Sequence, residues 1–232
     1  MKVYCINLES RVDRKERMIH VFNKYEELKE YEFVKAIDTS NDLVLSLHDQ
    51  FSHLDKAYIA CSESHFKVWN MIASLDVEYA LVLEDDVYFH KDWERILHEC
   101  LKSMPSDWEL FRLDCYYLVE WDFCSDGNCG GEGLRKATDC TFADAYLITP
   151  KACRWLLEKK KEFLENEEWM NNETLLMELQ EKGNTYTYFP HLALQHFDES
   201  DIQQKCTINT INAFYNDVYF KHISTNVYEH IE

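Results

Sequence analysis

Three consecutive acidic residues, Glu84, Asp85 and Asp86, directly follow the apolar run at residues 80–83. The run is short and rich in Leu and Val, so it predicts a buried strand with the carboxylates at its carboxyl end. Adjacent negative charges repel one another unless a cation or hydrogen-bond donors compensate them. Hard divalent metals bind carboxylate oxygens and keep coordination positions open for phosphate. The triplet is therefore a candidate metal–diphosphate site, and an acidic surface loop before a helix is the alternative.

A second polar segment, residues 7–14, follows the predicted first strand and opens the first helix. It contains Asn7, Arg11 and Arg14. Arginines and backbone N–H groups at a strand-to-helix turn suit a diphosphate or a nucleotide. The alternative is a solvated helical turn with charge pairs such as Asp13–Arg17. The chain has no GxGxxG and no GxxxxGK[ST] motif, so its sequence gives little support to a Rossmann dinucleotide site or a P-loop.

Cys61, Ser64 and His65 fall within one predicted helix, residues 56–75. A Cys–His nucleophile pair is one interpretation, because Cys61 and His65 are one helical turn apart. The sequence indicates no third residue that would orient the histidine. We therefore favour hydrogen bonding of Ser64 and His65 to a ligand, and a histidine satisfied within the core is the alternative.

The second half of the chain offers acidic residues that could act as a general base toward an acceptor hydroxyl: Asp139, Asp144 and Glu173. Glu173 lies in the first turn of a predicted helix, where the helix dipole favours a carboxylate in any case. His196 follows the last predicted strand and could complete a metal coordination sphere, although a lone histidine is more often a surface residue.

Strands and helices alternate along the chain without an internal repeat. The predicted strands are 2–8, 31–36, 79–83, 108–113, 143–148 and 185–189. The predicted helices are 12–28, 56–75, 90–102, 150–164 after an N-cap at Thr149, and 171–182 before Gly183. Residues 38–55 and 122–136 are predicted loops, and the chain after residue 189 is a looser tail. This order predicts an α/β fold with a mostly parallel sheet, in which ligands bind outside the carboxyl ends of the strands.

Composition narrows the classes of partner. The 232 residues suit one large domain or two small ones, and the formal charge of -19 opposes non-specific binding to nucleic acid or to anionic membranes. The nine cysteines form no CxxC pair, so a zinc ribbon is not indicated. No segment has the pattern of a signal peptide or the length of a membrane span, which predicts a cytoplasmic, reducing location.

Taken in order, these segments resemble glycosyltransferase family 25, which includes lipooligosaccharide galactosyltransferases and procollagen galactosyltransferase domains. The resemblance covers most of the chain and is carried by residues 3–14, 36–38, 60–69, 83–87, 145–148 and 200–202. Ala60 replaces the glycine of the family's Gly-Cys-x-x-Ser-His helix. Asn171, Asn172 and Glu173 stand where the family usually has Pro-x-Asp, which leaves the identity of the base open.

The resemblance implies a GT-A-like single domain over residues 1–232, with 1–114 mainly binding the nucleotide-sugar and 115–232 mainly on the acceptor side. It also implies a UDP-sugar donor, Mn²⁺ or Mg²⁺ at a DXD-like acidic motif, and inversion at the anomeric carbon. The implied roles are Asp86 and His196 as metal ligands; Asp85 toward the donor sugar or ribose with Glu84 in support; Asn7, Arg11, Arg14, Ser64 and His65 on the donor; and Glu173 or Asp144 as the base.

The expected function is metal-dependent transfer of a hexose, galactose first, from the UDP-sugar to a hydroxyl of a glycan or of a hydroxylysine-type protein acceptor. A homodimer is compatible with the aromatic content. Two other functions stay open. One is a catalytically inactive glycosyltransferase-like domain that binds glycan or protein, and the other is a different metal-dependent, nucleotide-using transferase.

Overall fold

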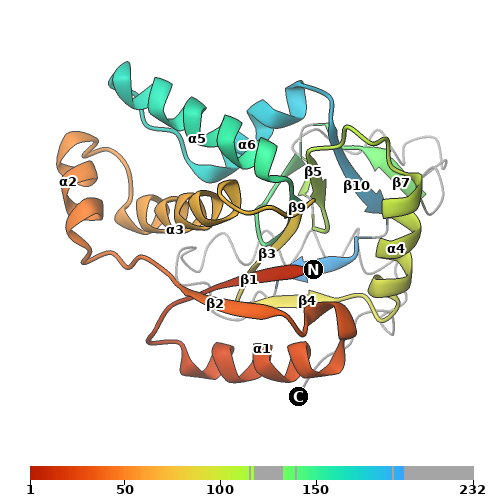
Figure 1. The fold of residues 1–232 in the computed structure, drawn as a ribbon. Helices are drawn as coiled ribbons and strands as arrows, with labels where there is room; N and C mark the ends of the chain where they lie inside the picture. The colour runs from red at the N-terminus through yellow and green to blue at the C-terminus, as the bar shows by residue number, and fades with distance from the viewer. Residues whose placement is uncertain (115, 118–132, 139, 190, 196–232) are drawn as a thin grey trace.

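The computed structural model describes residues 1–114, 116–117, 133–138, 140–189 and 191–195 (Figure 1). Its central sheet has seven strands. In order across the sheet they are β2 (Tyr31–Lys35), β1 (Lys2–Asn7), β3 (Ala80–Glu84), β9 (Ala145–Ile148), β5 (Leu110–Arg112), β10 (Thr185–Phe189) and β7 (Gly133–Lys136). Two further strand pairs are β4 (Val87–Phe89) with β11 (Ala193–Gln195) and β6 (Tyr116–Tyr117) with β8 (Cys140–Thr141).

The strand directions make the sheet mostly parallel. β1 pairs in parallel with β2 and β3, and β5 pairs in parallel with β10. β9 lies between β3 and β5 and runs antiparallel to both, and β7 runs antiparallel to β10 at the edge. The predicted α/β class with a mostly parallel sheet is confirmed, with two reversed strands that the sequence did not indicate.

Helices cover both faces of this sheet. They are α1 (Val12–Lys24), α2 (Asp42–Gln50), α3 (Lys56–Ala73), α4 (Trp93–Ser103), α5 (Pro150–Glu165) and α6 (Asn172–Glu181), with a short 3-10 helix at Glu26–Leu28. Figure 1 shows α1 on one side of β1 and β2, and α3, α5 and α6 on the other. The buried residues separate in the same way into one cluster with α1 and α4 and another with α3, α5 and α6.

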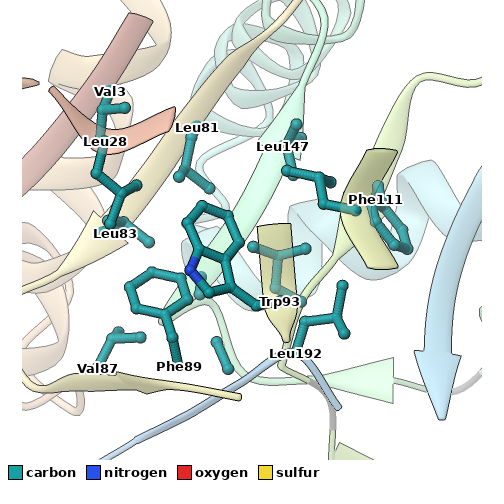
Figure 2. Packing of buried hydrophobic residues seen from close by; sticks show 14 of the residues in the cluster. Val3, Leu28, Leu81, Leu83, Val87, Phe89, Trp93, Phe111, Leu147 and Leu192 are labelled. Atoms are coloured by element: carbon teal, nitrogen blue, oxygen red, sulfur yellow. The ribbon is translucent and has the colours of Figure 1, made fainter. Parts of the chain in front are cut away.

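The strands read as continuous apolar runs because both of their faces are buried. Leu81 and Leu83 of β3 face the α4 side and belong to the same cluster as Trp93 (Figure 2). Ala80 and Val82 alternate to the opposite cluster, with α3. The period of two that governs strand side chains thus divides one apolar run between two cores.

Two predicted helix ends are confirmed. The Thr149 side chain accepts a hydrogen bond from the Ala152 amide at 3.2 Å, with Pro150 as the first helical residue. Gly183 follows α6 at a φ of 84°, in the left-handed region that favours glycine after a helix.

The predicted loop at 38–55 is wrong in part, because it contains α2. Asn41 caps this helix by accepting a hydrogen bond from the Leu43 amide at 3.0 Å. Val44 and Leu47 bury one side of it against Ile59 of α3. Only nine residues long, α2 gives a weak periodic signal, and its stability depends on that tertiary contact.

Other differences come from long-range strand pairing. The end of the predicted 122–136 loop forms β7, because it pairs with β10. The acidic triplet is followed by β4, which pairs with β11 in the segment predicted as a tail. Because β4 and a turn come first, α4 begins at Trp93 and not at residue 90 as predicted. The first helix ends at Lys24, four residues early, where a 3-10 turn follows.

Within the described residues, no helix combines the length and apolarity that crossing a membrane requires. The cytoplasmic location and the homodimer stay predictions. Cys5, Cys100 and Cys153 are buried free thiols, as expected for small apolar residues, and Cys140 is disulfide-bonded.

A pair of identical substitutions tests the core assignment. Leu81→Ala should lower the free energy of unfolding by about 2–5 kcal/mol, because it opens a cavity at a fully buried position of β3. Leu43→Ala, at a residue 46% exposed on α2, should change it by no more than about 0.5 kcal/mol. Urea unfolding followed by circular dichroism measures both, and equal losses would contradict the assignment.

Candidate functional site

The acidic triplet lies where the carboxyl ends of parallel strands meet. Glu84 is the last residue of β3, and Asp85 and Asp86 form the turn before β4. Asn7 ends the neighbouring parallel strand β1. The Glu84 amide donates to the Asp144 carbonyl at 2.7 Å, which fixes the backbone at this point. Such a place, at the ends of strands in an open sheet, is where α/β proteins bind ligands.

Donors from β1 and α1 hold the first aspartate. Arg14 Nη1 donates to Asp85 Oδ1 at 2.9 Å and to Asp86 Oδ2 at 3.1 Å. Asn7 Nδ2 donates to Asp85 Oδ2 at 2.7 Å, and Arg17 Nη2 donates to the Asp85 carbonyl oxygen at 2.6 Å. Both carboxylate oxygens of Asp85 are therefore satisfied, and its side chain is fixed in orientation.

Asp86 is less completely compensated. It is only 3% exposed, and its Oδ1 atom has no hydrogen-bond partner among the described residues. Its Oδ2 atom receives the Arg14 contact and a 3.4 Å contact from Gln195 Nε2. Burial and the neighbouring Glu84 raise the pKa of Asp86 to about 7. A buried carboxylate oxygen without a donor, in a carboxylate cluster, fits the oxygen ligands that Mn²⁺ or Mg²⁺ prefers.

A chain of hydrogen bonds supports Glu84 from behind. Trp69 Nε1 donates to Tyr146 Oη at 2.8 Å, Tyr146 Oη lies 2.9 Å from His65 Nδ1, and His65 Nε2 lies 3.1 Å from Glu84 Oε1. Because the indole can only donate, the Tyr146 hydroxyl is available to donate to Nδ1. The His65 proton then sits on Nε2 and faces the carboxylate. Each member of this chain thereby orients the next.

The acidic triplet, together with Arg14 and His65, lines a cavity of about 330 Å³. Its walls come from the end of β1 with α1, from residues 36–39 after β2, from one side of α3, from the acidic triplet and from Gln195. Its size is in the range of small-molecule binding sites. Its polar lining includes Arg14, His65 and the three carboxylates of the triplet.

A second group of acids lies near the triplet but does not line this cavity. Asp144 is 4% exposed, its Oδ2 atom has no partner among the described residues, and burial followed by Glu84 raises its pKa well above the usual value. Glu173, in the first turn of α6, is partly exposed, and burial raises its pKa too, against the opposing effect of Arg112. Asp144 therefore lies electrostatically between the triplet and Glu173, because Glu84, Asp86 and Glu173 each raise its pKa.

The structure brings together Asn7, Arg14, Asp85 and Asp86, and it joins His65 to Glu84. Other predicted site residues have different surroundings. Ser64 donates to the Ala60 carbonyl and accepts from the Ile37 amide, both at 2.8 Å, so its hydroxyl ties α3 to the end of β2.

The charge pairs of the first helix also differ from the Asp13–Arg17 pair of the alternative interpretation. Arg11 pairs with Asp13 at 2.9 Å, and Arg17 turns to the Asp85 carbonyl instead. The predicted metal ligand His196 and the candidate base Asp139 lie outside the described residues.

Three residues of the site were missed by reasoning from the sequence: Arg17, Gln195 and Tyr146. Arg17 follows Arg14 by three residues, which puts both on one side of α1, and this spacing could have indicated it. Tyr146 and Gln195 reach the site only through strand pairing and gave no local signal.

Comparison with known proteins gives a consistent result. Residues 1–176 match the family model described as "Glycosyltransferase family 25 (LPS biosynthesis protein)". Procollagen galactosyltransferase 2 of Mus musculus is 33% identical over 126 residues, which are 48% of this chain and 20% of that protein. A glycosyltransferase 25 family member of Aedes aegypti is 29% identical over 174 residues, which are 68% of this chain and 28% of that protein. The chain thus spans only 20% to 28% of the length of these two relatives.

The raised pKa of Asp86 predicts a pH-dependent cost in stability. The unfolded carboxyl ionises near its usual value of 3.8 and the folded one near 7, so stability is lost as the pH rises between these values. In metal-free protein with EDTA, Asp86→Asn should therefore raise the free energy of unfolding at pH 8 by on the order of 1–3 kcal/mol, and by much less at pH 4.5.

Urea unfolding at the two pH values measures this difference. Asp49→Asn, at an exposed position of α2, is the matched control and should show no comparable trend. A stabilisation by Asp86→Asn that is equal at both pH values would contradict the buried ionised state.

Proposed function

Because the chain belongs to glycosyltransferase family 25, we propose that it transfers a hexose, galactose first, from a UDP-sugar to an acceptor hydroxyl with the help of a divalent metal. The observation that carries this proposal is the unpartnered Oδ1 atom of buried Asp86, beside the Arg14-held Asp85, at the wall of the cavity. Under this proposal the mixed α/β sheet is of the GT-A type.

Asp86 would hold Mn²⁺ or Mg²⁺ through its Oδ1 atom, which has no hydrogen-bond partner among the described residues. Once bound, such an ion supplies Lewis-acid neutralisation of the departing diphosphate. The Arg14 guanidinium bonds to both aspartates and so reduces the repulsion between their charges before the donor binds. Asp85, which Asn7 and Arg14 fix, would present its carboxylate to the ribose or to the sugar.

The base that activates the acceptor is best assigned to Glu173. Asp144 is almost fully buried, whereas Glu173 is partly exposed. A raised pKa also suits Glu173, because a carboxylate with a pKa nearer neutrality is a stronger base. Attack from the side opposite the diphosphate would then invert the anomeric carbon.

The choice of galactose rests on the similarity of the chain to procollagen galactosyltransferases. The acceptor would be a hydroxyl on a glycan or on a protein side chain of the hydroxylysine type.

Release of UDP from UDP-galactose, UDP-glucose and UDP-N-acetylglucosamine tests the donor and the metal without a known acceptor. We expect turnover with Mn²⁺, its loss in EDTA and its return when Mn²⁺ is added. Asp86→Asn should lower the rate by at least about a hundredfold, because it removes an anionic metal ligand. Asp49→Asn, exposed on α2, should keep the rate of the unsubstituted protein.

Four outcomes would contradict this proposal. Full activity of Asp86→Asn, or full activity in EDTA, would exclude the metal role. Pyrophosphate release from a nucleoside triphosphate would indicate a nucleotidyltransferase, and binding of UDP-sugar without turnover would indicate an inactive binding domain.

The assignment of the base is tested separately. Glu173→Gln should lower kcat for transfer by about a hundredfold or more and remove the acidic limb of its pH profile, while the Kd for UDP stays within about twofold. Glu181→Gln, at an exposed position of the same helix, is the control. If Asp144→Asn alone gives this pattern, the base is Asp144.

A further inference from the structure

Three potential metal ligands of different chemistry meet on one wall of the cavity. The Cys61 sulfur, a His65 ring nitrogen and a Glu84 carboxylate oxygen all lie within 4.8 Å of one another. Cys61 and His65 are one turn apart on α3, and Glu84 ends β3, so two regular elements hold the three groups. All three residues line the cavity.

The spacing is close to that of a tetrahedral zinc site. Zinc bonds of about 2.3 Å to sulfur and about 2.0–2.2 Å to nitrogen or oxygen separate the ligand atoms by roughly 3.3–3.6 Å. His65 Nε2 and Glu84 Oε1 are already 3.1 Å apart. Because the Cys61 sulfur lies within 4.8 Å of the other two ligand atoms, it needs a shift of at most about 1.5 Å, which a side-chain rotation can supply.

The donor set also distinguishes this site from the Asp85–Asp86 pair. Thiolate and imidazole ligands select zinc, whereas carboxylates alone suit Mg²⁺ and Mn²⁺. Three protein ligands leave a fourth position, and the cavity provides the room for water or a ligand oxygen there.

The surroundings favour a bound cation over a reactive cysteine. Burial raises the pKa of the Cys61 thiol well above its usual value, and Glu84, Glu173 and Asp144 add to the effect. A nucleophilic cysteine needs the opposite shift, so a Cys61–His65 nucleophile pair is not supported. The same negative field attracts a divalent ion, which releases the thiol proton as it binds.

We propose that Cys61, His65 and Glu84 together bind one Zn²⁺ ion, at a site separate from Asp86. The ion takes the place of the proton that lies between His65 Nε2 and Glu84 Oε1 in the metal-free protein. His65 then carries its single ring proton on Nδ1 and donates it to Tyr146 Oη, 2.9 Å away, as the second ring nitrogen of metal-bound histidines usually does.

Occupancy of this site has a consequence that rests on the proposed function. A zinc ion on the cavity wall reduces the room for the donor beside Asp85, so Zn²⁺ should inhibit Mn²⁺-dependent UDP release, and Cys61→Ala should relieve the inhibition. The binding itself does not depend on that function.

Titration of the metal-free protein with Co²⁺, a spectroscopic substitute for zinc, tests the binding. We expect a thiolate-to-cobalt absorption band that saturates at one Co²⁺ ion per protein molecule. The band should disappear when Zn²⁺ is added. Cys61→Ala should abolish the band, and Cys153→Ala, at another free cysteine, should keep it. Asp86→Asn should also keep it, which separates this result from the outcome of the UDP-release experiment. An unchanged band in Cys61→Ala would overturn the proposal, as would its loss in Asp86→Asn.

A second measurement uses the unsubstituted chain and so does not depend on the folding of a variant. Zinc should slow alkylation of Cys61 by iodoacetamide at least tenfold, as measured by mass spectrometry of the peptide. An alkylation rate that Zn²⁺ leaves unchanged would likewise overturn the proposal.

Discussion

The contact on which the site depends is the sharing of one guanidinium, that of Arg14, between Asp85 and Asp86. It joins α1 to the turn after β3 and lets two adjacent carboxylates stay close together in a buried place. The compensation is incomplete, because burial and the neighbouring Glu84 raise the pKa of Asp86 in spite of the opposing charges of Arg14 and Arg17. Charged pairs in a low-dielectric site are stable only when their remaining hydrogen-bonding atoms are satisfied. The site therefore favours the binding of a further positive charge, such as the metal ion of the proposed function.

The reversed strand β9 connects the acidic triplet to the rest of the fold. Its position between β3 and β5 puts the Asp144 carbonyl in reach of the Glu84 amide. Two residues later, the Tyr146 side chain points into the α3 core and meets both Trp69 and His65. A single strand thus fixes the backbone of the triplet and orients the histidine behind it. Local packing and the geometry of the site are two results of the same strand pairing.

The parts of this structure that could be predicted are those with local causes. The apolar run of β3 with its acidic end, the Thr149 cap and the glycine after α6 each depend on a few neighbouring residues, and each was found. The direction of β9, the β4–β11 pair and the contribution of Tyr146 depend on residues far apart in the chain, for which no periodicity exists. The role of Arg14 in binding phosphate or nucleotide stays a prediction, and its pairing with the two aspartates became evident only from the fold. The role of His196 as a metal ligand stays a prediction, because this residue lies outside the described residues.

The strand order also has a consequence for association between molecules. β2 is the outermost strand on its side of the sheet, and its free edge is a row of backbone groups that another strand could pair with. Glu32 and Lys35 of this strand are exposed charged residues, and Lys67 of α3 donates to the Lys35 carbonyl at 2.9 Å. Charged side chains and an occupied carbonyl make this edge a poor template for strand addition. The sheet can therefore end at β2 without inviting edge-to-edge aggregation.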